Sequence, residues 1–92
     1  MKYNQASAIE KAKADLAERM GVSAAEIETV SVTEKDFSDM SLGAAVGGEM
    51  SAQMISSGWQ INLRADGESY EYRGDKYQLR LFGYKGANYV IE

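Results

Sequence analysis

The sequence feature that most constrains the fold is an Asp-Gly dipeptide at residues 66–67, which separates two stretches of alternating apolar and polar residues. Asp-Gly is typical of two-residue β-hairpin turns, because the backbone of such a turn needs positive φ angles. With this dipeptide at the tip, Leu63 lies opposite Tyr70, and Ile61 lies opposite Tyr72. Both pairs are apolar, so the turn and the side-chain pattern predict the same hairpin.

A second turn is predicted from the Gly-Asp dipeptide at residues 74–75. With these residues at the tip, Tyr72 lies opposite Tyr77, and Tyr70 lies opposite Leu79. Together the two hairpins predict a three-stranded antiparallel meander with one apolar and one polar face, because a one-residue slip would mix the faces. The predicted apolar face holds Trp59, Ile61, Leu63, Tyr70, Tyr72, Tyr77, Leu79 and Leu81. The predicted polar face holds Gln60, Asn62, Arg64, Ser69, Glu71, Arg73, Gln78 and Arg80.

An N-terminal helix is predicted from about Gln5 to Met20. The segment is rich in alanine and lacks proline, and the glycine that follows it is typical of a left-handed helix cap. One face of this helix is apolar and would cover the apolar face of the sheet. The residues of that face are Ile9, Ala12, Leu16 and Met20. We therefore expect burial of Ile9, Leu16 and Met20, and exposure of Glu10, Asp15 and Glu18.

The remaining segments extend the sheet. A capping-box pattern at residues 23–26 predicts a short helical turn, and alternating valines then predict a strand at about Glu28–Phe37. Residues 84–91 favour either a fifth strand or a segment that wraps an edge, and the pattern does not distinguish the two. The prediction is a single α+β domain over residues 1–92, with an N-terminal helix packed on one face of an antiparallel four- to five-stranded meander sheet.

The composition limits the functions that are open to this chain. It contains no cysteine and no histidine, which removes disulfide frameworks, thiolate nucleophiles and the commonest general base and metal ligand. A formal net charge of −4 and the lack of a basic stripe argue against nucleic-acid binding. No apolar run has the length of a membrane span or the form of a signal segment, so the chain is expected to be soluble, and cytoplasmic as written. We expect no enzymatic activity, no cofactor and no membrane partner.

Three short patterns suggest other functions, and each has a simpler explanation. Residues 16–27 resemble the first half of a helix-turn-helix, but a strand pattern stands where the recognition helix should follow. Residues 73–75 spell Arg-Gly-Asp, a tripeptide of cell-adhesion ligands, although a turn by itself favours Gly and Asp there. Asp36, Asp39 and Glu49 offer oxygen ligands for a hard cation, but their spacing matches no EF-hand-like loop, and solvated acidic residues explain them.

Several motifs occur in an order that is known from a protein family. They are Met20-Gly21-Val22, Glu26-Ile27, Val30-Ser31-Val32, Phe37-Ser38-Asp39, Ser41-Leu42-Gly43-Ala44-Ala45, Gln53, Gly58-Trp59 and the strand-turn-strand of residues 65–73. In these motifs residues 9–73 resemble an uncharacterised small bacterial domain family, often secreted or lipid-anchored. Its hallmark is a Trp-Pro-Asp run, then Ser-Leu-Gly-Cys-Pro, then Gly-Tyr, and an Asp-Gly turn before Tyr-x-Tyr. Ala44 and Ala45 replace the family's Cys and Pro, so any role of those two residues is absent here.

The resemblance to this family implies no activity and no ligand. The helix-on-sheet layout is also similar to that of PepSY and cystatin-like domains, which include peptidase inhibitors. This similarity of fold implies an inhibitor-like role only by analogy.

The segment Ser38–Gly58 is the predicted site of function, because it is long, irregular and not dictated by the fold. Its apolar residues either pack against the core, which we favour, or are covered by a partner. The candidate interaction residues are Phe37, Met40, Leu42, Gly43, Met50 and Met54. We expect a small non-catalytic binding or accessory module, a monomer or weak homodimer, with another protein as its partner. The alternative is a structural homo-oligomer formed by edge-strand pairing of the open sheet.

Overall fold

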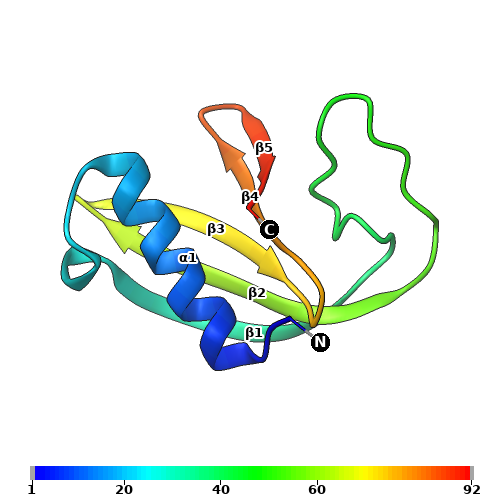
Figure 1. Ribbon diagram of the computed structural model, residues 1–92, viewed down its shortest axis with the longest axis horizontal. Coiled ribbons are helices and arrows are strands. Elements are labelled where there is room, and N and C mark those ends of the chain that lie inside the picture. Colours follow the sequence, from blue (N-terminus) through cyan, green and yellow to red (C-terminus); the bar gives the residue numbers. More distant parts are fainter. Residues whose placement is uncertain (1, 92) are drawn as a thin grey trace.

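A single helix lies across one face of a five-stranded antiparallel sheet in the computed structural model, which describes residues 2–91 (Figure 1). The strands follow one another in sequence order, so the sheet is a meander and the predicted α+β architecture is confirmed. The elements are α1 (Gln5–Met20), the 3₁₀ turn η1 (Ala24–Glu26), β1 (Glu28–Phe37), β2 (Ser56–Ala65), β3 (Glu68–Gly74), β4 (Leu79–Tyr84) and β5 (Ala87–Val90). Among the described residues, no helix is long and apolar enough to cross a membrane.

The helix α1 has the predicted bounds, and both of its ends are capped. Asn4 and Ser7 form a reciprocal capping box at the start, which the sequence analysis did not identify, and Gly21 adopts the left-handed conformation at the end. The buried face is formed by Ala8, Ala12, Leu16 and Ala17. Ile9 and Met20 are only partly buried, so the expected stripe is displaced toward the alanines. Small side chains let the helix backbone approach the sheet more closely than longer ones would.

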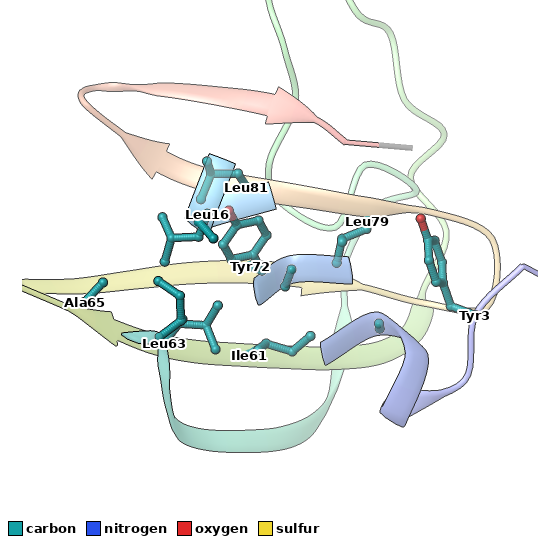
Figure 2. Close-up of a cluster of buried hydrophobic side chains, with 12 residues drawn as sticks. Tyr3, Leu16, Ile61, Leu63, Ala65, Tyr72, Leu79 and Leu81 are labelled. Atoms are coloured by element: carbon teal, nitrogen blue, oxygen red, sulfur yellow. The ribbon is translucent and has the colours of Figure 1, made fainter. Parts of the chain in front are cut away.

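The first hairpin has the predicted register, with Leu63 opposite Tyr70 and Ile61 opposite Tyr72. Asp66 and Gly67 both have positive φ angles, as a two-residue turn requires. The core therefore contains Ile61, Leu63 and Tyr72 beneath α1, as Figure 2 shows. Ala8, Ala12, Leu16, Ala65, Leu79 and Leu81 are in the same cluster.

The predicted register of the second hairpin is wrong. Tyr72 pairs with Leu81 and Gly74 with Leu79, because the turn is a longer loop closed by a hydrogen bond from the Asp75 N–H to the Gln78 carbonyl. The Asp75 carboxylate accepts hydrogen bonds from the backbone N–H groups of Tyr77 and Gln78. The displacement is an even number of residues, so Leu79 and Leu81 stay on the apolar face as predicted. Tyr77 therefore lies in the turn and not in the core, and 68% of its surface is exposed.

Of the two alternatives for the C-terminal segment, the fifth strand is correct. The turn between β4 and β5 contains Lys85 and Gly86, both with positive φ angles, and β5 pairs with β4. At the other edge, β1 has β2 as its single partner among the strands of residues 2–91, and it carries a bulge between Thr29 and Ser31. The sheet is therefore open at both edges, with a long edge strand on one side and a short one on the other.

Candidate functional site

Residues 38–55, called here the connecting loop, join β1 to β2 and contain most of the predicted interaction residues. Hydrogen bonds from Arg73 and Arg80 fix the first half of the loop to the sheet face opposite α1. Phe37, at the end of β1, is 4% exposed. Leu42 is fully buried, but it does not belong to the core that lies beneath the helix. The prediction that the loop packs is therefore correct for this half, although the loop packs on the sheet face opposite α1, called here the second face, and not against the core beneath the helix.

Arg73 on β3 binds the loop backbone near Leu42. Its Nη1 donates a hydrogen bond of 3.0 Å to the Leu42 carbonyl, and its Nε donates one of 2.6 Å to Glu71. The guanidinium lies 3.8 Å from the centroid of the Phe82 ring and 5.6 Å from that of Phe37. Arg73 thus links two aromatic rings on the second face, and cation–π attraction adds to its hydrogen bonds.

Arg80 on β4 holds the loop through a bidentate ion pair with Glu49. Both N–O distances are 2.6 Å, and Nη1 also donates to the Ala44 carbonyl at 3.2 Å. Arg80 is only 5% exposed, so its charge depends on these partners, because an unpaired buried charge is strongly destabilising. The hydrogen bonds from Arg80 hold the pKa of the Glu49 carboxyl below its usual value.

Two amide side chains complete the attachment of the loop. Gln78 donates to the Met40 carbonyl at 2.7 Å, and Asn88 on β5 donates to the Ala45 carbonyl at 2.9 Å. Four side chains from the C-terminal half of the sheet therefore bind loop carbonyls between Met40 and Ala45. The sequence analysis placed three of them (Arg73, Gln78, Arg80) on the polar face, but it did not identify this role.

One signal could have revealed the loop contact. In the observed register Arg73 lies directly opposite Arg80, and like charges in such a pair repel unless carboxylates or carbonyls lie between them. The signal was hidden because the predicted second turn put Arg73 and Arg80 out of register.

The acidic residues of this region have separate partners. The Asp39 carboxylate accepts hydrogen bonds from the Ser41 hydroxyl and from the backbone N–H groups of Ser41 and Gly43, and these bonds lower the pKa of Asp39. Asp36 accepts from the Ser57 hydroxyl at 2.8 Å, while Glu49 pairs with Arg80. Within residues 2–91 no three acidic side chains converge as metal ligands.

The second half of the connecting loop exposes apolar side chains. Met50 is 97% exposed, Met54 63% and Ile55 74%; these three residues are called here the apolar loop segment. Met40 is 42% exposed, and its N–H donates to the Ala52 carbonyl, so it lies beside this segment. The predicted candidates therefore divide. Phe37 and Leu42 are buried, Gly43 lies at the turn beneath Arg73, and Met40, Met50 and Met54 face solvent.

The other two sequence patterns have structural explanations. In the Arg-Gly-Asp tripeptide, Asp75 is 6% exposed and its carboxylate caps the turn, so the tripeptide is not displayed as an adhesion ligand would be. In residues 16–27, α1 is followed by the short η1 turn and then by β1. The second helix of a helix-turn-helix is absent from this part of the described chain.

The comparisons with known proteins give a family but no function. A family model for a domain of unknown function, DUF8738, matches residues 9–81. No curated protein and no solved structure matches the chain. The matched residues include the connecting loop together with Arg73, Gln78 and Arg80, so the match covers the loop and most of the side chains that hold it.

Proposed function

The chain belongs to the DUF8738 family of domains of unknown function, and from its structure we propose that it is a small non-catalytic module that binds another protein through the apolar loop segment. The carrying observation is the contrast within one loop. Residues 40–49 are fixed to the sheet by Arg73, Arg80 and Asn88, whereas the next residues extend Met50, Met54 and Ile55 into solvent.

This contrast favours binding over a purely structural role. Methionine adapts its shape to varied apolar partners. Residues 40–49 are already held to the sheet and β2 begins at Ser56, so only the short stretch between them loses conformational entropy when a partner covers it. Clustered exposed apolar side chains on a small protein are typical of interaction surfaces. The apolar loop segment therefore has the chemistry of a protein-binding surface and is anchored at both ends, by residues 40–49 and by β2.

The partner can be tested with a triple variant, Met50→Ser, Met54→Ser and Ile55→Ser. The matched control is Val30→Ser with Val90→Ser, since both valines are 47% exposed and lie outside the loop. Wild type and control immobilised on resin should enrich the same protein from a lysate of the host cell, and the triple variant should not. Calorimetry with the purified protein then confirms direct binding. Equal retention by all three chains would exclude the apolar loop segment as the binding surface.

A peptidase is the partner class that we propose first, by analogy with the cystatin-like domains to which the sequence analysis compared the helix-on-sheet layout. The test is inhibition of purified cysteine, serine and metallopeptidases by the wild-type chain and by the triple serine variant. Loop-dependent inhibition supports a peptidase as partner. A panel in which no peptidase is inhibited removes this class and leaves the binding proposal to the retention experiment.

A structural homo-oligomer is the second candidate function, favoured by the two open edges of the sheet, at β1 and at β5. Sedimentation equilibrium over a hundredfold range of concentration tests it. A mass of 10.1 kDa throughout excludes assembly, whereas a rising mass that persists in the triple serine variant supports pairing at a strand edge.

A further inference from the structure

The outer edge of β1 presents an unpaired strand to solvent, at the lower side of the sheet in Figure 1. The bulge near Val30 interrupts its regular geometry, but pairing with β2 is continuous from Ser31 to Phe37. Free backbone N–H and C=O groups along such an edge can bind an extended peptide as an additional strand. We call residues 31–37 the β1 edge.

The charges of the β1 edge are separated by face. Glu34 and Asp36 share the helix-side face, since they pair with Trp59 and Ser57, whereas Lys35 lies on the opposite face and donates to Gln60. Neither Glu34 nor Asp36 forms an ion pair with another residue in the described range 2–91. An added strand would place alternate residues opposite these two carboxylates, on one face.

A hollow of about 470 Å³ lies next to these carboxylates, with Trp59 in its wall. The indole is partly exposed, so it offers an aromatic face to a cation held by Glu34 or Asp36. Lys35 and Lys76 also line the hollow, so the two carboxylates are balanced by two ammonium groups. On the helix-side face Glu34 and Asp36 favour a positively charged side chain, because Lys35 belongs to the other face and Lys76 alone opposes it there.

A second copy of this chain does not fit the β1 edge as well. Antiparallel self-pairing centred on Lys35 puts the Lys35 residues of the two copies opposite each other, and it puts Glu34 of each copy opposite Asp36 of the other. Pairing centred on Glu34 puts the two Glu34 residues opposite each other. Like charges directly opposite each other destabilise a sheet. Pairing centred on Thr33 avoids these contacts but forms no opposite-charge pair. A different strand, with basic residues at alternate positions, satisfies both carboxylates.

We propose that the β1 edge binds an extended segment of a partner protein by strand addition, with Lys or Arg at alternate positions opposite Glu34 and Asp36 and one basic side chain against Trp59 in the hollow. This site is distinct from the apolar loop segment, so it stands whether or not the loop function is correct. The partner is recognised by its extended backbone and its spacing of positive charge.

The test uses the full chain and two fluorescein-labelled peptides of equal composition, Thr-Lys-Thr-Lys-Thr-Lys-Thr and Thr-Lys-Lys-Thr-Thr-Lys-Thr. Anisotropy should give at least about tenfold tighter binding of the alternating peptide, because only that peptide has lysines two residues apart, the spacing that matches Glu34 and Asp36 on one face of a strand. Amide chemical shifts should change along Ser31–Phe37. Equal binding of both peptides, or shifts confined to other regions, would overturn the proposal.

Three variants locate the binding energy. Glu34→Gln with Asp36→Asn should weaken binding of the alternating peptide roughly tenfold. The control is Glu10→Gln with Glu18→Gln, which changes the net charge equally on the exposed side of α1 and should leave the affinity within about twofold. Lys76→Gln should tighten binding. Equal weakening in both double variants would indicate general attraction to an acidic protein and would refute a site at the β1 edge.

Discussion

At the residue scale, Tyr72 joins the sheet to the helix. The ring is fully buried, and its hydroxyl donates a hydrogen bond of 2.7 Å to Asp15 on α1, where the sequence analysis expected an exposed carboxylate. Burial, with a smaller contribution from Asp15, raises the pKa of the Tyr72 hydroxyl, which therefore stays protonated. Asp15 also accepts from Arg19, whose guanidinium lies 4.5 Å from the centroid of the Tyr89 ring. This network connects β3, α1 and β5.

Replacing Tyr72 by Phe removes the hydrogen bond to Asp15 and keeps the ring in the core. We expect a loss of roughly 1.5–3 kcal/mol in the free energy of unfolding, as for hydrogen bonds to charged groups. Urea unfolding measures it, and Tyr77→Phe is the matched control, because Tyr77 is 68% exposed. The control should change stability by less than about 0.5 kcal/mol. Equal effects of the two changes would show that the Tyr72 hydroxyl bond contributes little.

Gly58 is required where β2 passes the end of β3. A Cβ atom at this position would overlap the Gly74 carbonyl oxygen and crowd the Asp75 side chain, and neither backbone can move without disturbing the ladder. We expect Gly58→Ala to lower the unfolding free energy by at least about 2 kcal/mol. Gly47→Ala is the control, since no atom lies within 4 Å of its Cβ position. A stable Gly58→Ala protein would indicate that the strands separate easily at this point.

At the scale of elements, the connecting loop is held by ionised groups, so its attachment depends on pH. The folded-state pKa values of Glu49 and Asp39 lie below their ordinary values of 4.5 and 3.8. A depressed pKa stabilises the fold above the unfolded-state value, and this contribution is lost as the pH falls through the folded-state value. The loop should therefore be fully held at neutral pH and begin to detach below about pH 4.5.

The loop's share of this pH dependence can be isolated with Glu49→Gln. At pH 7 the variant should melt at a lower temperature than wild type, because Arg80 loses its charged partner. The difference should begin to shrink as the pH is lowered below about 4.5, where the unfolded chain takes up a proton on Glu49, and should vanish only below the depressed pKa of Glu49 in the folded protein. Melting curves recorded by circular dichroism between pH 7 and pH 2.5 measure both effects. A difference that is constant over this range would contradict the role of the Glu49 charge.

At the scale of the whole molecule, the sheet carries two unlike layers. The helix side is an apolar core, whereas the loop side combines buried Leu42 and Phe37 with the ion pair between buried Arg80 and partly exposed Glu49. Opening the polar contacts that hold an exposed loop costs less free energy than unfolding a packed core. The two layers should therefore differ in stability.

Native-state hydrogen exchange measures this difference. Amides of the central strands β2 and β3 should exchange only through global unfolding, while the Met40 amide, bonded to the Ala52 carbonyl, should exchange through a smaller local opening. Denaturant should accelerate the first group strongly and the second group weakly. A Met40 amide that exchanges as slowly as those of Leu63 and Tyr72 would show that the loop unfolds only with the core.

The sequence by itself determined the elements whose signals are local. The bounds of α1, the η1 capping box, β1 and the register across Asp66-Gly67 each depend on a few neighbouring residues, and each was predicted correctly. Tertiary structure decided the second hairpin, because the Asp75 carboxylate closes a wider turn and Leu81 takes the place under α1 that Tyr77 was expected to occupy. It also decided the site. Arg73 and Arg80 were expected to be solvated residues of a polar face. Only a loop that is distant in sequence brings the Leu42 carbonyl to Arg73, and the Ala44 carbonyl and the Glu49 carboxylate to Arg80, which is buried among them.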